Sequence, residues 1–447
     1  MYVLIAIFYR GNIMGRHYQK AIPMRPAYDE KLINFSSSLG DAICKGKTIP
    51  NADNDVTYTL KLQNERLKEK NIEMDFEVFE WTNKSPAGNT FFDVEGWYDE
   101  YYKSTVGLAF LGVKRRIKQN GQVIYQDKHR RDFYGTVTDV ISGSHPDNES
   151  ICCPNCAAVS TIEELQNGCP FCGTQYKMDD LFPKITGFYF FDSLRMTKKQ
   201  VLIGWPVCTA VCALVSIIFR PFLNSIPVVA DILNSSYDPD YAVNILYGPV
   251  ACIVWGGFFF LLLHLLFKLA RVIVDLKRMG TAKSRERFEH RMKNITSGFS
   301  FEYFKNKAIS LIKTAIYSKD EGELLCYKGE PLPAEFKDII DLNYAGTFGI
   351  MGFVEENGII SVETKSYFDV LSVKDNAVSL SQPVISATFK RRTDIPVDLN
   401  FSMTKISCPA CARSFNPVKN KFCPSCGKEY ELITDDWVLT DLKMEKN

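Results

Sequence analysis

Eight of the fourteen cysteines fall into two groups whose spacing is typical of zinc ribbons. Each group contains two Cys-x-x-Cys turns, separated by twelve residues in the first group and eleven in the second. Such a turn directs two thiolates toward one point, and two turns complete the tetrahedral shell that zinc prefers. The sequence therefore predicts two zinc ions, bound by Cys153, Cys156, Cys169 and Cys172 in residues 151–181 and by Cys408, Cys411, Cys423 and Cys426 in residues 408–447.

The predicted role of both ions is structural, because four cysteines leave no open position for water or a substrate. Cys152 is an alternative first ligand, although Cys153 fits the spacing better. Disulfides are a competing interpretation, but they need an oxidising compartment. A redox-active Cys-x-x-Cys is a single pair at the start of a helix, not two pairs in register.

No catalytic arrangement is recognisable in the chain. None of the five histidines lies in a metalloprotease or nucleophile motif, and no Gly-rich phosphate loop occurs. The net charge of +1 argues against a general nucleic-acid binder, which carries a strong basic excess. We therefore expect a protein that is not an enzyme and does not bind nucleic acid.

Two long apolar runs without Asp, Glu, Lys or Arg occupy the middle of the chain, Gln200–Phe219 and Tyr241–Phe267. Twenty helical residues span roughly 30 Å, the thickness of a bilayer's hydrocarbon core. The runs predict two transmembrane helices in a hairpin, within an α+β multidomain membrane protein. Small residues recur every four positions in both runs, Gly204 and Gly256 among them, which predicts close contact between the two helices.

Basic residues flank the two runs on their outer sides. Lys198 and Lys199 precede the first run, and a basic helix predicted at 268–298 follows the second. The connection at 220–240 carries one arginine and three aspartates. The positive-inside rule then predicts a multi-pass protein of the cell membrane, with both termini in the reducing cytoplasm and an extracytoplasmic connection. Membrane lipids are predicted partners of the basic helix.

Residues 1–150 are predicted to form a mixed α+β domain with an antiparallel sheet. Asp29–Cys44 has helical spacing, whereas Val56–Leu62 is rich in the β-branched and aromatic residues of strands. Asn120-Gly121 lies between two strand-like runs and predicts a tight hairpin, because both residues accept a positive φ. The opening run Tyr2–Tyr9 is predicted to be a buried strand.

Residues 299–407 are predicted to form a second α+β domain with a cone-like plan. Ser300–Ile316 has one apolar face at helical spacing, with Ser300 as its N-cap. Asp320–Tyr327 and Pro333–Ile340 are predicted to be short helices. Strands follow, and Asn357-Gly358 predicts a second tight hairpin.

A resemblance rests on the segment FSFEYFKNKAISLIKTAIYSKDEGELLCY, the hairpin sheet after it and the closing ribbon CPACARSFNPVKNKFCPSCG. Residues 299–443 resemble bacterial membrane proteins with a zinc ribbon and a domain like the scaffold subunit of the mitochondrial import motor. The resemblance implies a cone fold similar to that of nuclear transport factor two. It also implies a membrane-associated scaffold or binding module without an enzymatic motif. The ribbon that follows residues 1–150 suggests a duplicated plan of domain plus ribbon.

These features predict a membrane-anchored cytoplasmic scaffold or adaptor that binds a protein or lipid partner through its α+β arms. One alternative is a membrane regulator that responds to zinc, redox state or lipid. Another is an enzyme that uses a pocket of the cone domain. The sequence leaves the partner and the oligomeric state open.

Overall fold

A computed structural model describes residues 22–80, 88–99, 101–141, 145, 148–166, 168–179, 183–192, 198–223, 253–266, 282–296, 298–374, 377–394, 402–405, 408, 410–413, 421–429 and 436–445. The predicted strand Tyr2–Tyr9 lies outside these residues. The chain divides into two units, Met1–Asp192 with Gly280–Asn447 and Ser193–Met279. The first unit contains two α+β halves, one before and one after the second unit in the sequence.

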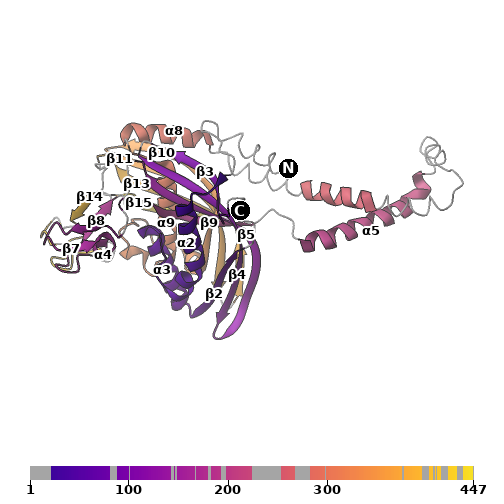
Figure 1. Ribbon diagram of the computed structural model, residues 1–447, viewed down its shortest axis with the longest axis horizontal. Helices are drawn as coiled ribbons and strands as arrows, with labels where there is room; N and C mark the ends of the chain where they lie inside the picture. Colours follow the sequence, from indigo (N-terminus) through magenta and orange to yellow (C-terminus); the bar gives the residue numbers. More distant parts are fainter. Residues whose placement is uncertain are drawn as a thin grey trace. The chain divides into compact units, whose positions relative to one another are not determined.

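The first half is an antiparallel sheet with two helices packed on it (Figure 1). Helix α2 (Pro26–Lys45) buries Leu32, Phe35 and Leu39 against the sheet. Helix α3 (Asn54–Glu69) follows it. The strands are β1 (Ile22–Pro23), β2 (Ile72–Glu80), β3 (Phe92–Tyr98), β4 (Tyr102–Gln119), β5 (Gln122–Val140) and β9 (Lys184–Asp192), in the order β1-β3-β4-β5-β9 with β2 also paired to β4.

The second half repeats this construction with helices α8 (Ala282–Ile295), α9 (Phe301–Tyr317) and α10 (Ala334–Lys337). The predicted cap is confirmed, because the Ser300 hydroxyl accepts a hydrogen bond from the Tyr303 N–H at 3.4 Å. The strands are β10 (Ile339–Glu356), β11 (Ile359–Lys374), β12 (Ala377–Ser381), β13 (Val384–Arg392) and β15 (Val438–Glu445), in the order β10-β11-β13-β15 with β12 also paired to β11.

Each half inserts a cysteine ribbon before its last strand. In the first half the ribbon lies between β5 and β9, and β9 returns antiparallel beside β5. In the second half the ribbon lies between β13 and β15, and β15 returns beside β13. The ribbon elements are β6 (Ser150–Cys152), β7 (Val159–Thr161), α4 (Ile162–Gln166), β8 (Tyr176–Asp179) and β14 (Ser402–Lys405). This repetition agrees with the duplicated plan that the sequence suggests.

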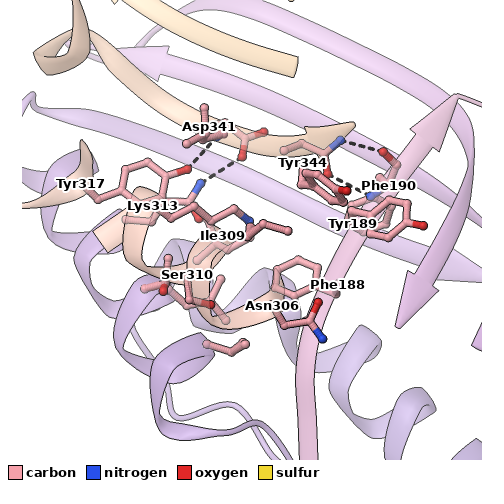
Figure 2. A pocket seen from close by; sticks show the side chains of 18 of the residues that line it. Phe188, Tyr189, Phe190, Asn306, Ile309, Ser310, Lys313, Tyr317, Asp341 and Tyr344 are labelled. Atoms are coloured by element: carbon pink, nitrogen blue, oxygen red, sulfur yellow. Dashed lines mark hydrogen bonds between the residues drawn. The ribbon is translucent and has the colours of Figure 1, made fainter. Parts of the chain in front are cut away.

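The two halves meet at a seam formed by α3 and α9 and by β9 and β10. Asn343 of β10 joins the two sheets, because its side chain accepts from the Phe190 N–H at 2.9 Å and donates to the Phe190 carbonyl at 2.7 Å. Arg66 of α3 reaches across to carbonyls of the second half. The seam encloses a cavity of about 50 Å³ (Figure 2).

Both Asn-Gly turns are confirmed, with φ of 50° at Asn120 and 53° at Asn357. The predicted strand Val56–Leu62 is wrong, because these residues lie within α3. The Asp53 carboxylate caps that helix by accepting from the Val56 N–H at 2.8 Å. Of the two predicted short helices, Asp320–Tyr327 contains only the 3-10 turn Glu321–Glu323. The other, Pro333–Ile340, is shorter than predicted and contains only α10, because β10 begins at Ile339.

The second unit contains helix α5 (Lys198–Leu223) and a helical stretch over residues 253–266. Their backbones approach closely, because a Cβ on Gly256 would lie 2.5 Å from the Thr209 Cα. The Trp205 indole also donates to the Ile253 carbonyl at 3.1 Å. Gly256 therefore lies in a close contact between the two apolar runs, as the sequence predicts, whereas Gly204 faces the ring of Phe260.

The predicted membrane topology is not upheld. Among the described residues, no helix combines the length and the apolarity needed to cross a bilayer. This finding contradicts the predicted spans at Gln200–Phe219 and Tyr241–Phe267, and with them the predicted multi-pass location in the cell membrane.

The predicted basic helix at 268–298 is described only as α8 and the residues just after it. Its apolar residues Phe288 and Met292 are buried in the core of the second half. Arg285 donates to the Glu302 carboxylate at 2.9 Å, and Lys293 donates to Asp99 at 3.0 Å. These basic side chains thus pair with acidic groups of the first unit.

Candidate metal centres

Four turns with one backbone pattern hold the eight predicted ligands. In each turn the first cysteine's carbonyl accepts from the residue after the second cysteine, at 2.8 Å. The first cysteine's N–H donates to a carbonyl five residues ahead, at 2.8–2.9 Å. The residue after the second cysteine has a positive φ in every turn; it is Ala157, Gly173, Ala412 or Gly427. The same two hydrogen bonds and a positive φ at the same position occur in all four turns. Each Cys-x-x-Cys turn therefore holds its two thiol groups in one fixed arrangement.

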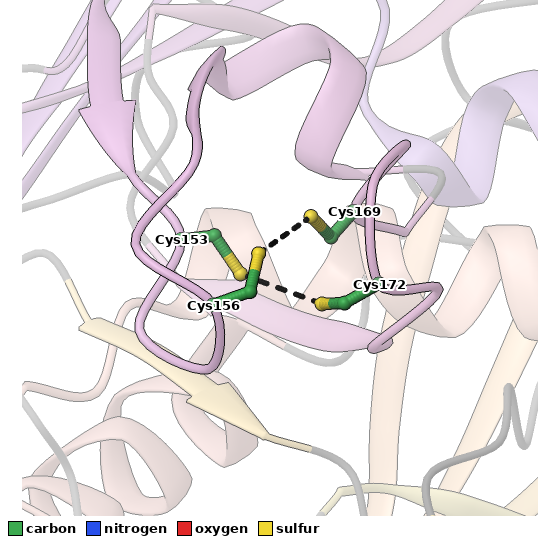
Figure 3. A group of neighbouring side chains, drawn as sticks. All are labelled: Cys153, Cys156, Cys169 and Cys172. Atoms are coloured by element: carbon green, nitrogen blue, oxygen red, sulfur yellow. Dashed lines mark hydrogen bonds between the residues drawn. The ribbon is translucent and has the colours of Figure 1, made fainter.

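The thiol groups of each ribbon converge on one point. In the first ribbon the Sγ atoms of Cys153 and Cys172 are 3.8 Å apart, and those of Cys156 and Cys169 are 3.7 Å apart (Figure 3). In the second ribbon the corresponding separations are 3.5 Å for Cys408 and Cys426 and 3.6 Å for Cys411 and Cys423. A tetrahedral site with Zn–S bonds of ~2.3 Å has sulfur atoms ~3.8 Å apart. The sulfur geometry therefore fits zinc and is too wide for disulfides, whose sulfur atoms lie ~2.05 Å apart.

Each ribbon buries one cysteine of every turn and exposes the other. Cys153, Cys169, Cys408 and Cys423 are buried, whereas Cys156, Cys172, Cys411 and Cys426 are exposed. Within the part of the chain that the structure describes, no histidine or carboxylate belongs to either group. Cys152, the alternative ligand, is exposed and lies outside the first group. Each predicted ligand set is thus brought together in full.

Two side chains beside the ligands of the first ribbon, Tyr176 and Thr174, affect its metal-binding chemistry. The sequence alone does not predict a functional role for either. The Tyr176 hydroxyl lies 2.9 Å from the Cys153 Sγ, in a small core with Leu165. Thr174 Oγ1 lies 3.2 Å from the Cys172 Sγ, and this contact lowers the pKa of Cys172 to about 5. Thiolates are the metal-binding form of cysteine, so both neighbours favour metal binding. The aromatic residue soon after each ribbon is the sequence signal that could have revealed Tyr176.

The second ribbon is tied to the second half by Lys421 and Glu429. Lys421 donates to the Gly322 carbonyl at 2.8 Å, and Lys328 forms an ion pair with Glu429. Arg413 donates to the Ser425 hydroxyl at 3.2 Å and links the ribbon's two turns.

The two ribbons are joined to each other. Strand β8 leaves the first ribbon after Thr174, and β14 leads into the second ribbon at Cys408. The two strands pair antiparallel, from Ser402 opposite Asp179 to Lys405 opposite Tyr176. Both metal sites therefore belong to one lobe, although more than 200 residues separate them in the sequence.

The protein-family models, the curated proteins and the solved structures include no match to this chain.

Proposed function

We propose that the protein is a non-catalytic scaffold or adaptor whose partner-binding lobe is held together by two structural zinc ions. The observation that supports this most is the pair of four-cysteine groups with tetrahedral sulfur spacing, joined by the β8–β14 ladder. Under this proposal the second half is a cone-like domain related to the import-motor scaffold. Its helices followed by an antiparallel meander are consistent with that relation.

A structural role fits the small size of each ribbon's own core. Among the described residues, the first ribbon's core consists of Cys153, Leu165, Cys169 and Tyr176, and that of the second consists of Cys408 and Cys423. Cores this small bury too little apolar surface to order a chain segment, so metal binding has to supply the folding free energy. Since all four ligands of each group are cysteines, zinc would be held in a closed shell.

Exposed apolar side chains on the ribbons support a protein partner. Phe171 lies within a turn of the first ribbon and is 70% exposed, and Val159 nearby is 62% exposed. Phe422, which precedes Cys423 in the second ribbon, is 53% exposed. Aromatic side chains are enriched at protein interfaces, where they contribute much of the binding free energy. We assign these residues to the partner-binding surface.

Metal analysis tests the zinc part of the proposal. Protein purified without chelators is expected to contain about two zinc ions per chain, and Cys423→Ser with Cys426→Ser is expected to lower this to about one. Cys152→Ser is the matched control and should leave two. Iron in place of zinc, or less than one metal ion per chain, would contradict the proposal.

Proximity labelling in the source cells tests the scaffold part. Phe171→Ser with Phe422→Ser is expected to lose a protein that the wild type labels, while its zinc content stays at two. Val123→Ser, which alters an exposed apolar residue of β5, is the control and should keep the partner. If both variants label the same proteins as the wild type, the ribbon surface is not where a partner binds.

A further inference from the structure

The cavity at the seam is lined by residues of both halves. Helix α9 contributes Ile309, Ser310 and Lys313, and β9 contributes Phe188 and Tyr189 (Figure 2). Helix α3 completes the apolar part of the wall with Val56 and Leu60. The cavity thus combines aromatic and aliphatic walls with a few polar groups, which is the usual composition of a small-molecule site.

Two polar groups of the cavity wall have no hydrogen-bond or ion-pair partner within the part of the chain that the structure describes. One is the Lys313 amine, which lies 5.1 Å from the centre of the Phe188 ring. The other is the hydroxyl of Ser310, a residue that is only 6% exposed. Residues three apart on a helix share one face, so both groups project from the same side of α9.

Several other polar groups of the wall are already paired. Asp341 accepts from Arg115 at 2.7 Å and from Gln63 at 3.1 Å, and Tyr317 accepts from the Leu342 N–H at 2.7 Å. Asn306 donates to the Thr186 hydroxyl at 3.0 Å. The carboxylate of the wall, Asp341, is therefore engaged with an arginine, and Lys313 has no counterion in contact among the described residues.

A partly buried ammonium group without a counterion costs free energy, because it loses water and gains no ion pair. Consistent with this cost, burial lowers the pKa of Lys313 to about 8, although Asp341 acts in the opposite direction. Besides Lys313 and Asp341, the titratable groups on the wall are the side chains of Arg131, Tyr189, Tyr317 and Tyr344. An anion placed in the cavity would supply the missing counterion.

We infer that the seam cavity is a binding site for a small carboxylate, with Lys313 as its counterion and Ser310 as a hydrogen-bond donor. The apolar walls select a ligand with a hydrocarbon body over an inorganic anion. A cavity of about 50 Å³ has room for roughly four waters, since each needs ~10–15 Å³. That space suits a carboxylate of about four or five non-hydrogen atoms, such as propionate. This inference goes beyond the proposed scaffold function and does not depend on it.

Titration calorimetry of the full-length zinc-loaded protein with propionate tests the inference. A Kd on the order of 0.1–1 mM is expected, which lies within the ligand-efficiency limit for a ligand of this size. Lys313→Met keeps the volume and removes the charge, and it is expected to weaken binding by roughly 10–150-fold, the value of one charged hydrogen bond. Ser310→Ala is expected to weaken it by roughly 2–10-fold. Lys319→Gln, which changes an exposed lysine just beyond α9, should leave the Kd unchanged.

Two further probes and one measurement on the wild type complete the test. Propionamide lacks the charge and inorganic phosphate lacks the hydrocarbon body, so both should bind at least tenfold more weakly. In the wild-type protein, saturating propionate should raise the pKa of the Lys313 amine. This pKa is measured by NMR on protein whose lysines carry isotopically labelled methyl groups. This readout holds even if the Lys313 variant does not fold. Equal binding of propionamide, tighter binding of phosphate, or an unchanged Lys313 pKa would overturn the inference.

Discussion

Arg66 offers the sharpest test of how the two halves are held together. Its side chain is only 4% exposed and extends from α3 to the second half. The guanidinium donates to the carbonyls of Ile316 at 2.9 Å and Ser318 at 2.7 Å, both at the C-terminal end of α9. It also donates to the Lys337 carbonyl at 2.6 Å, at the end of α10. Carbonyls at helix ends have no partner within the helix, so Arg66 supplies the donors that they lack.

The expected loss in the free energy of unfolding follows from these three hydrogen bonds. In Arg66→Met the carbonyls of Ile316 and Ser318 lose a buried donor, at about 1–3 kcal/mol each. The Lys337 carbonyl is only partly buried, so water can replace its donor. Burial lowers the pKa of Arg66, which means that burying this cation has a cost that Met avoids. The expected net loss is about 3 kcal/mol in the free energy of unfolding.

Urea denaturation followed by tryptophan fluorescence measures this loss. Lys61→Met makes the same kind of change on the same helix, but the Lys61 side chain is 63% exposed and its ion pair with Glu65 spans 3.7 Å. That control should change the free energy of unfolding by no more than about 0.5 kcal/mol. A loss below about 1 kcal/mol for Arg66→Met, or equal losses for both variants, would refute the role given to Arg66.

Three further predictions concern the ribbon, a buried acid and a close contact. Tyr176→Phe removes the hydroxyl beside Cys153 and should weaken zinc binding at the first ribbon roughly tenfold, measured by competition with a chromophoric chelator. Burial raises the pKa of Glu95 to about 7, so folding favours its protonated form. The free energy of unfolding should therefore fall as the pH rises from about 4.5 through 7. Glu95→Gln should flatten this part of the stability–pH curve. Gly187→Ala places a Cβ 2.7 Å from the Asn306 Oδ1 and should lower the unfolding free energy by about 1–3 kcal/mol in urea titrations.

The sequence predicts most of the metal centres and the hairpins because their signals are local. The spacing within Cys153–Cys172 already determines which thiols can meet, and the structure brings the same four together. Asn120 and Asn357 likewise act through their own backbone conformation. Features that depend only on neighbouring residues are therefore predictable without knowledge of the fold.

Features that depend on distant contacts were missed or misassigned. The β-branched residues of Val56–Leu62 favour a strand, but the Asp53 cap and the burial of Gln63 and Arg66 at the seam fix a helix there. Lys313 shares a cavity with Phe188, more than 100 residues away, and no local pattern indicates this. The membrane prediction also failed, since no helix among the described residues is both long and apolar enough to cross a bilayer.

The pairing of β8 with β14 has a consequence for synthesis of the chain. Asp179 leaves the ribosome more than 200 residues before Ser402, an interval of roughly 10–45 s at 5–20 residues per second. During that time β8 has an open hydrogen-bonding edge, since β14 is its only partner strand among the residues that the structure describes. Open edges invite pairing with other chains, and charged side chains discourage it. Lys177 and Asp179 place two charges within the four residues of β8, so the nascent strand carries its own protection until its partner is made.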